Sequence, residues 1–117
     1  MVTKDVEALI RLIGRVAEEK KGQHIVALNV SELSSITDYH LIISAGNSIR
    51  ARALADAIRE ATREEGLRPL RQEGYAEGRW ILLDYGDVLI HIFLEEVRAH
   101  YDLERLWGDA PREALLP

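Results

Sequence analysis

Two aspartates and a histidine lie close together in the last third of the chain. Asp84 and Asp87 flank Gly86, and His91 follows four residues later. Carboxylates on neighbouring strands hold magnesium in metal-dependent nucleotidyltransferases, and histidine is a common general base. Aspartate is also a favoured turn residue, because its side chain accepts hydrogen bonds from nearby backbone N–H groups. No third carboxylate is evident. We therefore favour a turn for the aspartates, a packed or interfacial role for His91, and neither a catalytic nor a metal site.

The segment Gly46-Asn47-Ser48 is a second candidate, because it precedes a helical pattern. The free N–H groups of a helix N-terminus can hold a phosphate, and Arg50 and Arg52 are nearby. However, the segment lacks the glycine spacing of a dinucleotide-binding or P-loop fingerprint. A serine N-cap at Ser48 explains the same residues. We expect a cap here and no cofactor.

The stretch 80–93 must position Asp84, Asp87 and His91, and its alternation predicts a β-hairpin that turns at Gly86. An even-length loop pairs Leu83 with Val88 and Trp80 with His91. One face of this hairpin is then aliphatic core: Ile81, Leu83, Val88, Ile90 and Ile92. The other face is mixed: Trp80, Leu82, Leu89, His91 and Phe93, with Asp84 and Asp87 at its turn end. A mixed face of this composition is typical of a surface that meets a partner.

Hydrophobic periodicity predicts the remaining elements. Helices are expected over 5–21, 48–65 and 95–107, the first with Thr3 as its N-cap. Strands are expected over 25–30 and 38–45, with a short edge strand around 70–72. This order predicts an α/β fold in which helices flank a mixed β-sheet. A single domain over 1–108 and a loose tail over 109–117 are expected.

The overall composition limits the function classes. The 117 residues carry a formal net charge of −5, which argues against broad neutralisation of nucleic-acid phosphates but is compatible with a local basic patch. The chain has no cysteine and therefore no thiolate nucleophile or disulfide. No apolar run is long enough to span a bilayer, and no signal-peptide pattern is present. A cytoplasmic location and no membrane contact are expected.

Several stretches together resemble the ribosomal silencing factor family, also called Iojap-like proteins. They are Lys20-Lys21, Ser34 to Tyr39, Gly46 to Ser48, Glu73-Gly74, the hairpin from Trp80 to Phe93, and Arg98 to Trp107 with its Tyr-x-Leu-Glu-x-Leu-Trp ending. The resemblance covers nearly the whole chain. The hairpin and this ending are specific when they occur together.

The resemblance implies a nucleotidyltransferase-like topology without the catalytic carboxylates, so an enzyme is not expected. It also implies that the protein binds the large ribosomal subunit through its fourteenth protein and sterically blocks joining of the small subunit when nutrients are scarce. Direct RNA contact would be minor. Organellar relatives instead assist large-subunit assembly, which remains an alternative. The implied partner-binding residues are Trp80, Asp84, Tyr85, His91 and Glu95.

Two rival interpretations stay open. In the first, the chain is a metal-dependent nucleotidyltransferase that uses the turn at 46–48 with Asp84 and Asp87. In the second, the mixed hairpin face is a homodimer interface. A dimer could also store this face until a ribosome competes for it.

Overall fold

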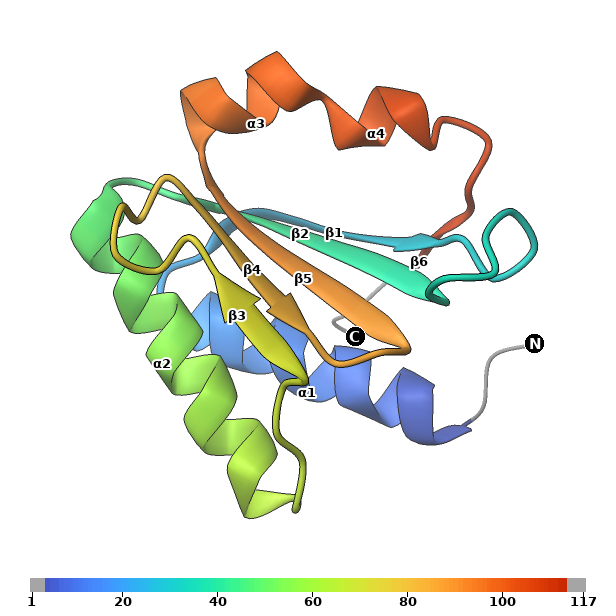
Figure 1. Ribbon diagram of the computed structural model, residues 1–117, viewed down its shortest axis with the longest axis horizontal. Helices are drawn as coiled ribbons and strands as arrows, with labels where there is room; N and C mark the ends of the chain where they lie inside the picture. The colour runs from blue at the N-terminus through green and yellow to red at the C-terminus, as the bar shows by residue number, and fades with distance from the viewer. Residues whose placement is uncertain (1–3, 114–117) are drawn as a thin grey trace.

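A mixed β-sheet lies between two layers of helices (Figure 1). The computed structural model describes residues 4–113, so the expected N-cap Thr3 lies outside the described residues. Helices α1 (Lys4–Glu19) and α2 (Ser48–Glu64) cover one face, and α3 (Glu95–Tyr101) and α4 (Leu103–Leu106) lie over the other. The strands are β1 (Gln23–Asn29), β2 (Tyr39–Ala45), β3 (Arg71–Glu73), β4 (Trp80–Asp84), β5 (Val88–Leu94) and β6 (Arg112–Glu113). None of these helices has the length and hydrophobicity that a membrane crossing requires.

The strand order is β3-β4-β5-β2-β1-β6. Strands β2 and β5 are parallel, and every other neighbouring pair is antiparallel. The parallel pair requires a crossover, which α2 provides on one face of the sheet. All seven residues of β2 are buried, as expected for an interior strand. The predicted α/β fold with a mixed sheet and flanking helices is confirmed.

The first core lies between the sheet and the α1–α2 layer. The predicted aliphatic face of the hairpin is confirmed, since its five side chains are fully buried: Ile81, Leu83, Val88, Ile90 and Ile92. Helix α2 contributes Ala51, Leu54, Ala55 and Ile58, as its periodicity predicts. Thr62 is also buried, and its hydroxyl finds partners there in the carbonyl of Arg59 and the hydroxyl of Tyr85.

The hairpin register differs from the prediction by two residues. Asp84 pairs with Leu89 and Trp80 pairs with Phe93, so Trp80 does not stand opposite His91. Asp84 and Leu89 are the last pair before the turn, so four residues, 85–88, lie between them. The last of these, Val88, pairs instead with Tyr39 of β2. A two-residue shift keeps every side chain on its predicted face, which is why the face assignment holds although the pairing was wrong.

Two local predictions near α2 and α3 are corrected. The N-cap of α2 is Asn47, whose Oδ1 accepts a hydrogen bond from the Arg50 N–H at 2.8 Å, and not Ser48. The expected single C-terminal helix is split into α3 and α4. Asp102 adopts a left-handed conformation with φ of 48° between them, so the helical hydrogen-bond pattern is interrupted there.

The segment expected to be a loose tail takes part in the fold as far as it is described. Ala110 is 7% exposed and packs in a second core, whose other buried members are Leu28, Val30, Ile42, Phe93 and Val97. Arg112 and Glu113 pair with Leu28 and Ala27 at the edge of the sheet. Residues 114–117 lie outside the described part of the chain.

Candidate functional site

The mixed face of the hairpin is covered over one half and open over the other. Helix α3 lies over β5 and β2, which buries Phe93 and His91. Toward β3 the same face is only half-buried. We call this part the open face; it consists of Trp80, Leu82, Asp84 and Leu89. Arg71 and Glu73 of β3 border it, because they pair with Asp84 and Leu82.

Trp80 is held in one orientation by its neighbours. Its indole Nε1–H donates to Nδ1 of His91 at 3.1 Å. Its ring lies 5.0 Å from the ring of Phe93 and 4.6 Å from that of Tyr101, between centroids. Aromatic pairs at such distances stabilise each other beyond their buried area. The indole is therefore ordered, yet part of the residue stays accessible.

Two buried histidines continue this chain of hydrogen bonds. The Nε2 of His91 lies 3.0 Å from Nδ1 of His40. An indole N–H only donates, so Nδ1 of His91 must accept and its Nε2–H must donate to His40. Burial, aided by the nearby His40, lowers the pKa of His91 to about 3, and burial also lowers the pKa of His40. Both rings are consequently neutral near pH 7.

His91 is 4% exposed, which corrects its expected place on a partner-binding surface. The rings of Phe93 and His40 lie 5.8 and 5.1 Å away, between centroids, and Trp107 of the C-terminal segment stacks on His40. The alternation in the sequence identified the correct face. It gave no sign that α3 and the segment after it cover this half. The geometry gives His91 a positioning role toward Trp80.

Asp84 behaves as the turn interpretation predicts. Its Oδ1 accepts a hydrogen bond from the Gly86 N–H at 2.8 Å, and Gly86 has the positive φ of 83°. Its Oδ2 lies 3.1 Å from Nε of Arg71. The carboxylate therefore fixes both the turn and the adjoining edge strand, and it remains partly accessible.

Tyr85 lies on the side of the sheet that faces α2. Its hydroxyl is 2.7 Å from Oγ1 of Thr62, and its ring packs against the first core. Burial raises the pKa of this hydroxyl, and the hydrogen bond with Thr62 partly opposes the shift. The expected grouping of Tyr85 with Trp80 is therefore corrected, because Tyr85 directly follows Asp84 and its side chain lies on the opposite side of the sheet.

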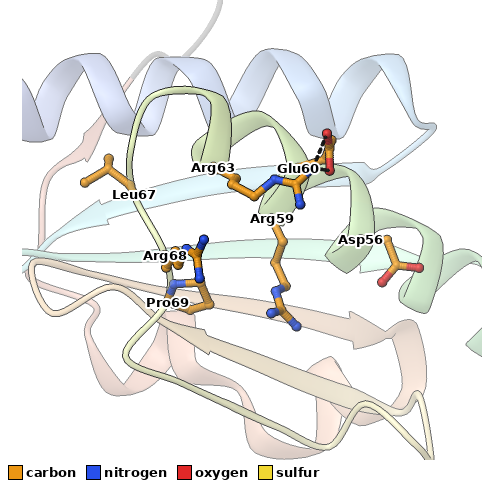
Figure 2. A pocket seen from close by; sticks show the side chains of 7 residues that line it. All are labelled: Asp56, Arg59, Glu60, Arg63, Leu67, Arg68 and Pro69. Carbon is orange, nitrogen blue, oxygen red and sulfur yellow. Dashed lines mark hydrogen bonds and ion pairs between the residues drawn. The ribbon is translucent and has the colours of Figure 1, made fainter.

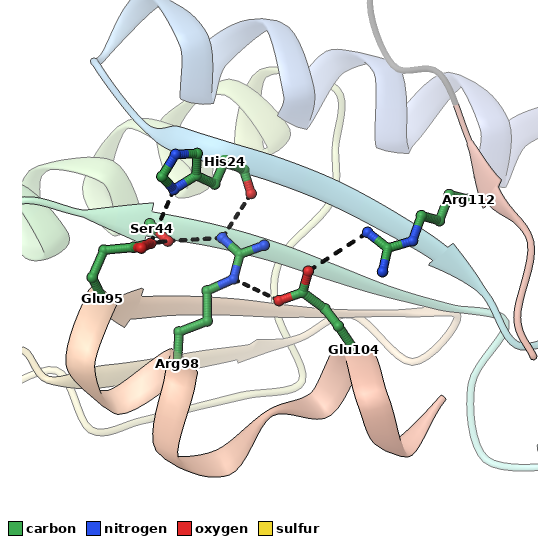
Figure 3. A network of polar contacts seen from close by, with 6 residues as sticks. All are labelled: His24, Ser44, Glu95, Arg98, Glu104 and Arg112. Atoms are coloured by element: carbon green, nitrogen blue, oxygen red, sulfur yellow. Dashed lines mark hydrogen bonds and ion pairs between the residues drawn. The ribbon is translucent and has the colours of Figure 1, made fainter. Parts of the chain in front are cut away.

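Glu95 is exposed, but its carboxylate is engaged at the start of α3 (Figure 3). The Ser44 hydroxyl donates to it, and Nδ1 of His24 lies 3.1 Å away. These contacts, Ser44 first, lower the pKa of Glu95. The side chain is directed toward β1 and β2, so it does not form one patch with Asp84.

Arg98 lies at the centre of the same network and is 8% exposed. Its Nη1 donates to the carbonyl of His24 and to the hydroxyl of Ser44, both at 2.7 Å, and its Nε donates to Glu104 at 2.8 Å. Arg112 of β6 approaches the same carboxylate at 3.6 Å. The network joins α3, α4 and β6 to the central strands. No sequence pattern indicated it, because its members come from distant segments.

A hollow of about 360 Å³ lies beside Trp80. Trp80 and Tyr101 give it an aromatic wall, and Glu77 and Arg79 add one charge of each sign. Tyr101 itself is 52% exposed. The hollow extends the open face past Trp80 and could receive a partner's side chain.

The fold places this chain among small α/β domains in which a mixed sheet lies between two helical layers. A crystal structure of a protein from Chromobacterium violaceum is similar, with a TM-score of 0.85 and 32% identity, covering 88% of this chain and 86% of that one. A family model described as "Ribosomal silencing factor during starvation" matches residues 3–116. The chain belongs to the ribosomal silencing factor family.

Individual relatives agree with this assignment. A protein named ribosomal silencing factor RsfS from Halalkalibacterium halodurans is 39% identical over 105 residues, which is 90% of each chain. The chloroplastic protein Iojap of Zea mays is 32% identical over 98 residues, covering 84% of this chain and 42% of that protein. The resemblance to this family is therefore confirmed.

Proposed function

We propose that this protein binds the large ribosomal subunit through its fourteenth protein and sterically prevents the small subunit from joining. Members of the family carry the name ribosomal silencing factor, which supports a role on the ribosome. In this mechanism, the volume that the bound protein occupies is enough to keep the small subunit from joining. No chemical turnover is involved.

The open face is the surface we assign to this contact. The single observation that carries the assignment is the ordered, partly accessible Trp80, whose indole is held by His91, Phe93 and Tyr101. Tryptophan anchors dominate many interfaces, and an anchor that is already ordered loses little conformational entropy on binding. Leu82 and Leu89 supply apolar area beside it, and Asp84 supplies a charge at the rim.

Charge supports a protein partner for this face. The chain has a formal net charge of −5, and a basic ribosomal protein would attract it. Glu73 and Glu77 lie near the open face and its hollow, where they can meet basic side chains. A broad contact with RNA on this face would place these carboxylates against phosphates.

The substitution Trp80→Ala tests the assignment. We expect it to weaken binding to purified large subunits by about 2 kcal/mol, or roughly 30-fold in dissociation constant, because an interface anchor is lost. Sedimentation of the protein with large subunits measures this effect. A subunit-joining assay should show a parallel loss of inhibition.

The matched controls separate binding from folding and from general surface effects. Ile36→Ala shortens an apolar side chain that is 83% exposed in the loop before β2, and it should leave sedimentation unchanged. Urea unfolding must show that the Trp80→Ala protein is folded. Undiminished co-sedimentation of that folded variant would refute the open face as the ribosome contact. A mass in light scattering that rises with concentration, and drops on Trp80→Asp, would instead support a homodimer interface.

A further inference from the structure

A second hollow lies on the opposite side of the sheet, between α2 and the loop that follows it (Figure 2). Its volume is about 370 Å³. Arg59 and Arg63 reach it from α2, and Arg68 reaches it from the loop, so three guanidinium groups share one opening. Leu67 and Pro69 form the apolar part of its wall.

We propose that this hollow binds neighbouring phosphates of an RNA strand. The segment 50–71 carries six arginines, no lysine and four acidic residues, so it is positive within a chain whose net charge is −5. Arginine binds phosphate through two parallel N–H groups, which suits it better than lysine to oriented phosphate contacts. The hollow is thus a local basic patch, which is compatible with the negative net charge of the chain.

The guanidinium groups have donors to spare. Across residues 4–113, the side chain of Arg68 has neither a hydrogen-bond nor an ion-pair partner. Arg59 uses only Nη1, which donates to Gln72 at 2.9 Å. Arg63 uses only Nη2, which donates to both oxygens of Glu60 at 2.8 and 2.7 Å. The remaining N–H groups of these side chains can therefore meet phosphate oxygens.

The acidic residues of the hollow oppose phosphate binding only weakly. Glu60 and Arg63 form an exposed pair, with 56% and 60% of their side chains accessible, and such pairs contribute little stability. A phosphate can therefore replace Glu60 on the guanidinium. Asp56 is engaged by the hydroxyl of Tyr75, which lies 3.0 Å from both of its oxygens.

The position of the hollow fits an RNA strand that passes along the edge of the β-sheet. Arg59 and Arg63 are one helical turn apart, on one side of α2, and Arg68 extends the row. Gln72 of β3 contacts Arg59, while Arg71 and Glu73 of the same strand border the open face. A partner protein on the open face and an RNA strand in the hollow could thus be bound together. The choice of RNA over other polyanions rests on the proposed ribosomal function.

Fluorescence anisotropy with a short, unstructured, labelled RNA tests the proposal on the isolated chain of 117 residues. We expect salt-dependent binding that the double substitution Arg63→Gln/Arg68→Gln weakens at least tenfold at low salt. The slope of log affinity against log salt concentration should fall by about 1.4, since each lost phosphate contact on a single strand contributes about 0.7. The matched control is Arg11→Gln/Arg15→Gln, which removes two exposed arginines from α1 and should bind as the wild type does.

Three outcomes would overturn the proposal. They are no RNA binding by the wild type, an equal loss in the α1 control, and displacement of the RNA by equimolar pyrophosphate. The last result would indicate a site for a small anion instead of a strand. Trp80→Ala should retain full RNA binding. A failure of RNA binding is therefore distinguishable from a failure of the open face to bind large subunits.

Discussion

Trp80 keeps its place through two neutral histidines. A proton added to the pair disrupts the chain of hydrogen bonds, because either the Trp80 N–H or a histidine N–H would then face another donor. The pKa of His91 is low, about 3, mainly because the ring is buried and also because His40 lies beside it. The accessible indole and its buried support therefore form one unit.

We predict that folding stability falls as the pH drops from 7 to 5. The pKa of His91 is 6.5 in the unfolded chain and about 3 in the folded one, so the unfolded state binds more protons between these values. The contribution of His91 to the free energy of unfolding is fully present above pH 6.5 and is lost progressively below it. Since one pKa unit corresponds to about 1.36 kcal/mol, the loss is about 2 kcal/mol at pH 5. The pKa values of Glu95 and Glu104 are lowered, so their contributions are lost at lower pH and interfere little.

Urea unfolding at pH 7 and pH 5 measures this loss. His91→Gln should reduce the dependence, because it removes the histidine with the larger pKa shift and leaves only that of His40. His100→Gln changes an exposed histidine of α3 and should keep the wild-type difference. If the His91→Gln protein lost as much stability as the wild type between the two pH values, this explanation would be wrong.

At the scale of elements, the α3–α4 layer depends on polar contacts as well as on apolar ones. Helix α4 has only four residues and no buried side chain, so it cannot be stable alone. The layer is joined to the sheet by Arg98, which reaches β1, β2 and α4 through separate hydrogen bonds (Figure 3). The α3–α4 layer therefore depends on the hydrogen bonds of Arg98 to stay over His91 and His40.

We predict that Arg98→Met destabilises the protein by about 3 kcal/mol, since it leaves Glu104 without its closest cation in a partly buried position. Amide hydrogen exchange should accelerate in α3 and α4 before it does in β2. Arg105→Met removes an exposed arginine of α4 and should have little effect. Equal exchange rates in the two variants would show that apolar contacts alone hold the layer.

At the scale of the whole molecule, the sheet extends to the C-terminal segment. Strand β6 pairs with β1, and the Asn29 N–H donates to the carbonyl of Pro111 at 2.8 Å. Without this segment β1 would be an edge strand with unpaired backbone groups, which promotes association between chains. The folded unit thus reaches beyond residue 108.

We predict that truncation after Gly108 lowers the free energy of unfolding by about 2 kcal/mol, from the lost strand pairing and the lost packing of Ala110. Truncation after Glu113 keeps both and is the control. Urea unfolding and light scattering check stability and association. A fully stable, monomeric chain ending at Gly108 would show that β6 is dispensable.

The sequence alone determined the two long helices, the main strands and the faces of the hairpin. Alternation in a strand has a period of two, so Ile81 and Leu83 had to share a side, and Trp80 and Leu82 had to share the other. An even error in register does not change this result. The helical stripe of α2 was predictable for the same reason, because its apolar spacing is local.

Only the tertiary structure decided which half of the mixed face is accessible. His91 is buried and Leu82 is partly exposed because α3 and the C-terminal segment fold back mainly over β5 and β2, and Tyr101 of α3 meets β4 at Trp80. That choice depends on contacts between residues far apart in the chain, such as Arg98 with His24 and Trp107 with His40. Local periodicity states which side of a strand is apolar, whereas the element that covers it is selected by the packing of the whole chain.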